Sequence, residues 1–179
     1  MKEFEVKLRL ASIPDLSRYE FLGEAEEEDV YFQHPCRDFS KTDEALRIRI
    51  RKSSREEILI TYKGPREPGR VKIREEIEFP IPSREEAEKI LIKLGFKPVA
   101  RIKKRRRAYR VGNAYVTIDE VEDLGLFMEI EASSEEEVIN TRRSLGVEAE
   151  EEKRTYLELF LLHHGHTLRD VDEEVDESY

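Results

Sequence analysis

The sequence predicts an α+β fold, with a largely antiparallel sheet of eight strands, enough to close into a barrel, and helices packed on its outside. Segments in which apolar and charged residues alternate recur along the chain, and short turns typical of hairpins join most of them. Four segments with apolar residues at helical spacing could cover the apolar faces of these strands. A chain of 179 residues can bury one full core, so a single domain is expected.

The expected strands each have an apolar face and a charged face. In the first strand Glu3, Glu5 and Lys7 share one side, while Phe4 and Val6 share the other. The same alternation predicts strands at residues 3–10, 29–32, 45–51, 58–63, 70–79, 99–111, 114–120 and 125–131.

The expected helices lie between and after these strands. Ser83 and Glu86 form the pattern of a capping box, and Gly95 follows the last apolar residue of that segment. Together the four helices are expected near residues 14–22, 83–94, 134–145 and 151–164. We predict one domain over residues 1–168 and a loose acidic tail over residues 169–179. Residues 26–29, within the acidic run at 24–29, are interpreted as a surface segment, and Arg51 as solvated or paired outside the site.

Composition excludes several classes of function. The net charge of -9 argues against a general binder of nucleic acid or of anionic membranes. Cys36 is the only cysteine, which excludes a disulfide framework and fits a reducing, cytoplasmic compartment. No long apolar run is present, so neither a signal peptide nor a membrane span is expected.

Pairs of glutamates recur on the predicted strands. Glu3 and Glu5, residues 76 and 78, and residues 129 and 131 each form a Glu-x-Glu pair, followed by a predicted helix that ends in Leu-Gly. Repetition of the pair favours charged faces that look into a lumen, because the helices can then cover the apolar faces. A lumen with charges of both signs must hold water, divalent cations and a multiply charged anion.

An ordered series of motifs resembles the CYTH domain, the family of class IV adenylate cyclases and thiamine triphosphatases, also called triphosphate tunnel metalloenzymes. The series comprises E-x-E-x-K at residues 3–7, L-R-I-R at 46–49, T-Y-K-G at 61–64, R-x-E-x-E at 74–78, K-x-R-x-x-Y at 104–109, residues 119–131 and residues 153–159. The segment 31–39 is most similar to the class IV adenylate cyclase branch. The resemblance spans nearly the whole chain.

The resemblance implies a closed eight-stranded barrel whose charged tunnel binds a triphosphate and two divalent cations, Mg²⁺ or Mn²⁺. The implied metal ligands are Glu3, Glu5, Asp119, Glu129 and Glu131, with Glu76 and Glu78 as further ligands or as partners of the basic groups. The implied phosphate-binding residues are Lys7, Arg47, Arg49, Lys63, Arg74, Lys104, Arg106 and Lys153. Glu3, Glu5 and Lys7 are expected to carry catalysis.

Two enzymatic activities are compatible with such a tunnel. Motif similarity favours a cyclase that converts ATP to cyclic AMP and pyrophosphate. A tunnel that needs only a triphosphate tail makes hydrolysis of inorganic tripolyphosphate or thiamine triphosphate a near-equal alternative. A noncatalytic triphosphate-binding protein and a homodimer are left open. A nucleic-acid binder that uses the basic run at residues 101–110 is disfavoured, because strand alternation sends these residues to opposite faces.

Overall fold

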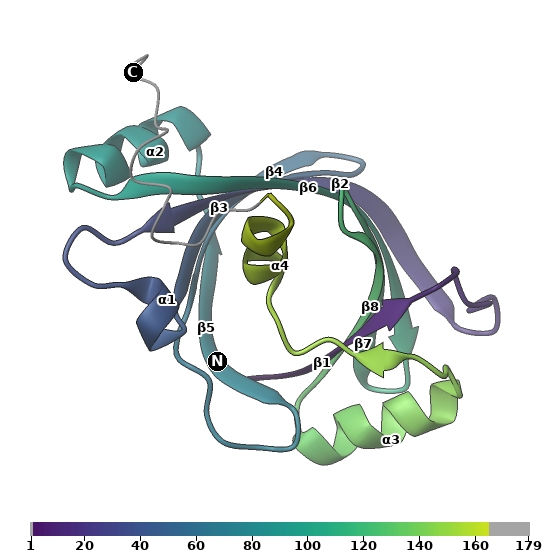
Figure 1. Ribbon diagram of the computed structural model, residues 1–179. Helices are drawn as coiled ribbons and strands as arrows, with labels where there is room; N and C mark the ends of the chain where they lie inside the picture. Colours follow the sequence, from purple (N-terminus) through teal and green to yellow (C-terminus); the bar gives the residue numbers. More distant parts are fainter. Residues whose placement is uncertain (1, 165–179) are drawn as a thin grey trace.

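The computed structural model describes residues 2–164, and these form a closed antiparallel barrel with four helices around it (Figure 1). The strands are β1 (Lys2–Leu10), β2 (Glu20–Gln33), β3 (Ala45–Lys52), β4 (Glu56–Lys63), β5 (Lys72–Pro80), β6 (Lys97–Val111), β7 (Ala114–Val121), β8 (Gly125–Ala132) and the short β9 (Glu150–Glu151). The helices are α1 (Phe39–Thr42), α2 (Arg84–Lys93), α3 (Glu135–Leu145) and α4 (Tyr156–His163).

The ring runs β5-β4-β3-β2-β6-β7-β8-β1, and β1 closes it by pairing with β5 as well as with β8. Counted in either direction, β2 lies four places from β1, so these two strands face each other across the interior. The predicted closed barrel of eight antiparallel strands is thereby confirmed.

Of the three apolar clusters in the described part of the chain, two lie outside the barrel, as the charged inner faces require. Leu8, Met128 and Ile130 point outward and are covered by Val138 of α3. On another side, Leu91 of α2 packs against an apolar cluster of β2 and β3. Both helices begin at a serine cap, as their sequences predict.

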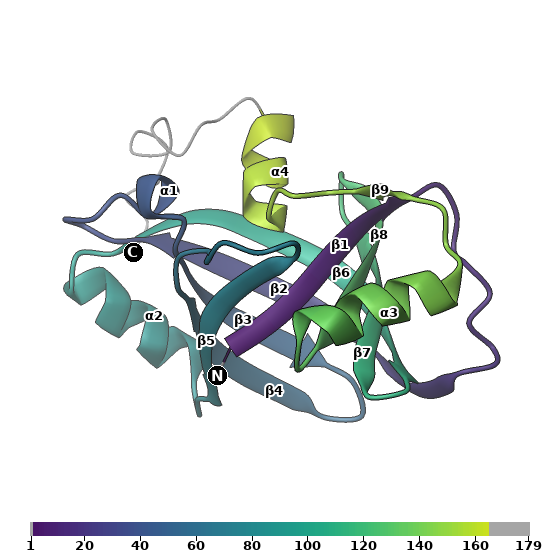
Figure 2. The same ribbon diagram turned by 90° about the horizontal axis from the view of Figure 1, so that it is seen from below.

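Helix α4 lies over one end of the barrel (Figures 1 and 2). Its buried residues pack on Phe127 and on the inward-facing Ile102. Thr155 and Glu158 form a capping box at its start, so the helix begins later than the predicted residue 151. The two residues of β9 pair with β1 instead.

The predicted helix at residues 14–22 is wrong. A turn occupies residues 17–19, and β2 begins at Glu20, nine residues before the expected start of this strand. Electrostatics explain the difference, because the acidic half of β2 pairs with the basic strand β6 and sets Glu24 opposite Arg107 and Glu26 opposite Arg105.

Within residues 2–164, no helix combines the length and the apolar character that a membrane crossing requires. The acidic tail expected at residues 169–179 lies outside the described residues.

Candidate functional site

Charged side chains line a cavity of about 490 Å³ inside the barrel. Among the described residues its lining contains ten basic side chains and six carboxylates. The basic ones are Lys2, Lys7, Arg47, Arg49, Arg51, Lys63, Lys72, Arg74, Lys104 and Arg106, and the acidic ones are Glu3, Glu5, Glu76, Glu78, Glu129 and Glu131. The lining thus carries four more basic than acidic side chains, and three further carboxylates stand directly behind the basic ones.

The six glutamates all come from three adjacent strands, β8, β1 and β5, and we call them the carboxylate wall. Glu5 lies directly opposite Glu131 in the pairing of β1 with β8, so the two side chains point the same way at close range. Burial, then the neighbouring Glu5 and Glu76, raise the pKa of Glu3 to about 8 against the opposing effect of Lys63. Burial and the neighbouring carboxylates also raise the pKa of Glu131.

Three lysines from β1, β4 and β5 balance part of this wall. Lys63 lies 3.0 Å from Glu3 and 2.9 Å from Glu76. Lys7 lies 3.3 Å from Glu129, and Lys72 lies 3.5 Å from Glu5.

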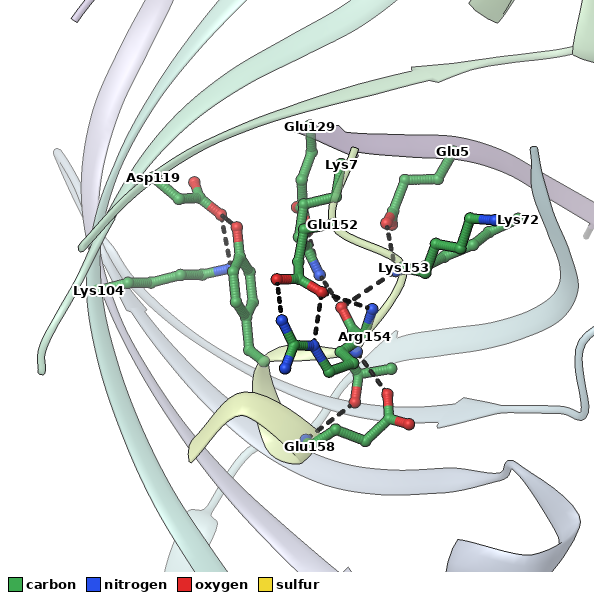
Figure 3. Close-up of polar contacts among 12 residues, drawn as sticks. Glu5, Lys7, Lys72, Lys104, Asp119, Glu129, Glu152, Lys153, Arg154 and Glu158 are labelled. Atoms are coloured by element: carbon green, nitrogen blue, oxygen red, sulfur yellow. Dashed lines mark hydrogen bonds and ion pairs between the residues drawn. The ribbon is translucent and has the colours of Figure 1, made fainter. Parts of the chain in front are cut away.

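The segment before α4 contacts two of these lysines. The main-chain carbonyl of Arg154 accepts hydrogen bonds from the ammonium groups of Lys7 at 3.3 Å and Lys72 at 3.4 Å (Figure 3). The segment that leads into α4 therefore helps to position the two lysines that pair with Glu129 and Glu5 of the carboxylate wall.

The opposite side of the cavity is basic, and we call Arg47, Arg49, Arg51, Lys104 and Arg106 the cation wall. These side chains come from β3 and β6, and three carboxylates stand behind them. Asp29 of β2 accepts two hydrogen bonds from Arg49, from Nε at 2.6 Å and from Nη2 at 2.7 Å. Burial alone would raise the pKa of the Asp29 carboxyl, but Arg49 and Arg47 hold it well below its usual range.

Glu27 of β2 serves four members of the cation wall. Its oxygens lie 2.7 Å from Arg51, 3.1 Å from Arg49, 3.3 Å from Lys104 and 3.9 Å from Arg106. Its pKa is also held well below the usual value, because these cations outweigh the effect of burial.

Asp119 of β7 is the third buried carboxylate. It accepts hydrogen bonds from Arg106 at 2.7 and 2.5 Å, from Lys104 at 3.2 Å and from the Tyr156 hydroxyl at 2.9 Å. The Tyr156 ring lies 3.9 Å from the ammonium of Lys7 and 4.9 Å from that of Lys104, which are cation–π distances. Tyr156, interpreted from the sequence as a packing residue, therefore joins both walls.

The structure gathers most of the predicted site residues around one cavity, with two exceptions. Lys153 is exposed and is not part of the lining. Asp119 is fully buried behind Arg106 and Lys104 and does not line the cavity. Its carboxylate therefore does not reach a position where it could bind a metal ion in the cavity, as the prediction requires.

Four residues of the site were missed from the sequence. The interpretation of residues 26–29 as a surface run is wrong for Glu27 and Asp29, which are 3% and 1% exposed. The placement of Arg51 outside the site is also wrong, because it lines the cavity and pairs with Glu27. Lys72 shares the inward face of β5 with Arg74, and this alternation was visible in the sequence.

The carboxylate wall fits hard divalent cations by its chemistry, because carboxylate oxygens are the ligands that Mg²⁺ and Mn²⁺ prefer. The raised pKa values of Glu3 and Glu131 point the same way, since a bound cation would relieve the mutual repulsion of these groups. Within residues 2–164, no three carboxylate, imidazole or thiol groups are already grouped around one metal position. Metal binding at this wall would thus require the glutamate side chains to turn toward one another.

Comparisons with known proteins agree with this geometry. The family model of the CYTH domain matches residues 1–156. A protein of Methanocaldococcus jannaschii named "putative adenylate cyclase" is 36% identical over 175 residues, which cover 89% of this chain and 98% of that protein.

Solved structures show the same fold. A protein of Pyrococcus horikoshii has a TM-score of 0.81 and 41% identity, over 89% of this chain and 98% of that one. A Hippeastrum protein, described as a "putative adenylyl cyclase" with a dominant triphosphatase activity, has a TM-score of 0.64 over 93% of this chain and 96% of that one. Its identity is 18%, so it supports the fold alone.

Proposed function

The chain belongs to the CYTH domain family, and from this premise we propose that it is a divalent-metal-dependent enzyme that binds a triphosphate in the barrel cavity and hydrolyses it. One observation carries the proposal: a cavity in which a carboxylate wall faces a cation wall. Such a cavity offers one side to divalent cations and the other to phosphate oxygens.

Residues of the cation wall would bind the phosphate chain. Arg47 and Arg106 line the cavity, where their remaining guanidinium N–H groups can donate to phosphate oxygens, and Lys104 adds a point charge. Phosphoryl transfer needs little covalent help from a protein, so fixed charges that match the developing negative charge can supply much of the rate.

Residues of the carboxylate wall would hold two Mg²⁺ or Mn²⁺ ions, with Glu3, Glu5, Glu129 and Glu131 as the main ligands and Glu76 and Glu78 beside them. When bound, these ions supply Lewis-acid neutralisation of phosphate charge. Lys7 and Lys72, which pair with Glu129 and Glu5 of this wall, would hold the terminal phosphate near the glutamates.

Hydrolysis is favoured over cyclisation by the composition of the lining. Small-molecule pockets are mostly lined by apolar and aromatic groups, whereas 16 of the 23 lining residues of this cavity are charged. A triphosphate chain could satisfy these charges without help from a base or a sugar.

Cyclisation of ATP is the second candidate. It is favoured by the name of the Methanocaldococcus relative and by the similarity of segment 31–39 to the cyclase branch. In this reaction the ribose 3'-hydroxyl would attack the innermost phosphorus and pyrophosphate would leave.

Product analysis tests the proposal. The protein is incubated with tripolyphosphate, thiamine triphosphate or ATP, each with Mg²⁺ or Mn²⁺. We expect orthophosphate from tripolyphosphate, whereas cyclic AMP with pyrophosphate from ATP would select the cyclase. Glu5→Gln should abolish either activity, and Glu75→Gln, an exposed glutamate of β5, is the matched control. Binding without turnover of any substrate would reject the enzyme in favour of a triphosphate-binding protein.

A further inference from the structure

Glu27 and Asp29 lie on β2, the strand that faces β1 across the barrel, and both are buried among the cations of the opposite wall. Neither residue lines the cavity. They therefore cannot touch a ligand there, and any effect they have on the reaction must pass through the arginines and lysines that they contact.

The contacts of Arg49 engage all three nitrogens of its guanidinium. Its Nε and Nη2 bind the two oxygens of Asp29, and its Nη1 lies 3.1 Å from Glu27. Two of these nitrogens are hydrogen-bonded to one buried carboxylate and the third is ion-paired with another, so the guanidinium has little freedom to rotate.

Arg47 has fewer contacts with the β2 carboxylates than Arg49 has, and its guanidinium also faces the carboxylate wall. Its Nη1 lies 3.4 Å from Asp29 and its Nε lies 3.3 Å from the Thr61 hydroxyl. Its Nη2 points across toward Glu78 at 3.6 Å. One end of this guanidinium is thus anchored on β2, while the other extends toward the carboxylate wall.

We propose that Glu27 and Asp29 are positioning residues, which hold the cation wall in the geometry that the transferred phosphate requires. The inference rests on the proposed function. Five cations on two strands repel one another, and a flexible array would pair with whichever carboxylate or phosphate oxygen came near. Two buried carboxylates behind the array set its spacing before the substrate arrives, so the arginines need not reorganise during the reaction.

Substitution of each carboxylate by its isosteric amide distinguishes a positioning role from a role in affinity, stability or metal binding. Asp29→Asn removes a negative charge, so the cavity becomes more positive and should bind tripolyphosphate at least as tightly. Arg49 and Arg47 lose their common anchor, and a misplacement of about 1 Å can lower a rate about 100-fold. We therefore expect kcat to fall about 100-fold while KM for tripolyphosphate stays the same or falls.

Glu27→Gln is the second variant, and it provides the same test if Asp29→Asn does not fold. Its expected effect has the same direction, because Glu27 contacts four cations. The matched control is Glu26→Gln on the exposed face of the same strand, which should keep kcat and KM.

Three outcomes would overturn the positioning role. If KM rises and kcat does not change, the carboxylates contribute only to affinity. If kcat per folded molecule and KM are both unchanged while the melting temperature falls, their role is purely structural. If the affinity for Mn²⁺ falls, they act as metal ligands.

A measurement without turnover keeps this inference separate from the proposed function. The Arg49 Nε–H should give a slowly exchanging signal in a ¹H–¹⁵N NMR spectrum of wild-type protein, and Asp29→Asn should remove this signal. A protected signal in Asp29→Asn contradicts the positioning role, whatever the substrate is. Failure of wild-type protein to bind or cleave any triphosphate rejects only the proposed function.

Discussion

The two walls of the cavity carry opposite charges, and they differ in how far the protein itself satisfies them. On the cation wall, Arg49, Lys104 and Arg106 all have carboxylate partners from β2 or β7. On the carboxylate wall, neighbouring cations outweigh burial and hold the pKa values of Glu76 and Glu129 below their usual value, whereas burial raises the pKa values of Glu3 and Glu131. The protein itself thus pairs the charges of the cation wall, whereas on the carboxylate wall Glu3 and Glu131 are the positions where an added cation would stabilise the charged form.

The two faces of β6 extend the comparison to the outside of the barrel. Lys104 and Arg106 point inward to buried carboxylates. On the outer face Arg105 and Arg107 pair with Glu24, in contacts that remain accessible to solvent. One carboxylate thus offsets part of the positive charge of these two exposed arginines.

The largest expected effect comes from removing an inner cation. Arg106→Met would leave Asp119, Glu27 and Glu129 with one cation fewer in a buried place, and breaking such a pair costs about 3–5 kcal/mol of unfolding free energy. Turnover should fall at least about 100-fold, as when a preorganised electrostatic contact is lost. Urea unfolding and steady-state kinetics measure the two effects.

Arg105→Met is the matched control on the outer face. Its side chain is 53% exposed, and exposed pairs contribute about 0–1 kcal/mol. If both variants lost the same stability, the distinction between the two faces of β6 would be mistaken.

Asp119→Asn tests whether this buried carboxylate supports the cation wall or binds a metal ion. Since Asp119 binds Arg106, Lys104 and Tyr156 and does not reach the cavity, we expect turnover to fall about 10- to 100-fold with no change in the affinity for Mn²⁺. Electron paramagnetic resonance of bound Mn²⁺ measures that affinity. A large loss of Mn²⁺ affinity would restore Asp119 to the metal ligands, the role expected from the family resemblance.

The pH dependence of the unfolding free energy tests the raised pKa of Glu3 on the carboxylate wall. The folded-state pKa of Glu3, about 8, is above its ordinary value of 4.5, so the folded protein holds a proton that the unfolded chain releases. Metal-free protein should therefore lose stability as the pH rises from 6 to 8, by about 2–3 kcal/mol at about 1.4 kcal/mol per pH unit. Chemical unfolding at a series of pH values measures this loss.

Two comparisons isolate the effect of Glu3. Glu3→Gln should remove most of the pH dependence, because the amide does not titrate. Saturating Mg²⁺ should also remove it, since the cation would take the place of the proton. An identical pH profile for wild-type protein and Glu3→Gln would contradict the assignment.

Strand alternation predicted most of the strands and which residues share a face, and the family resemblance implied the closed barrel. Lys7, Arg47 and Arg106 occupy the positions that a two-residue period assigns to them. The same period would have placed Glu27 and Asp29 inside, on the face of Tyr31, but the density of acidic residues at 24–29 concealed the strand.

The partner of that acidic segment could not be deduced from local pattern. Glu24 and Glu26 lie opposite Arg107 and Arg105, about 80 residues later in the chain, and only the pairing of β2 with β6 explains why an acidic run is extended. Likewise, the burial of Asp119 behind Tyr156 depends on where α4 packs, which no period in the sequence specifies.

The smallest expected effect concerns Tyr156, the residue that joins the two walls. Tyr156→Phe keeps the ring near Lys7 and Lys104 but removes the hydroxyl that donates to Asp119. Loss of one buried hydrogen bond costs about 1–2 kcal/mol, and Asp119 retains its bonds from Arg106 and Lys104. We expect a melting temperature lower by a few degrees and turnover within about threefold of wild type.

Tyr156→Leu also removes the ring and should lower turnover further, because two lysines lose a cation–π contact. Equal kinetics for the Phe and Leu variants would show that the ring does not link the walls and that α4 contributes to the cavity by packing alone.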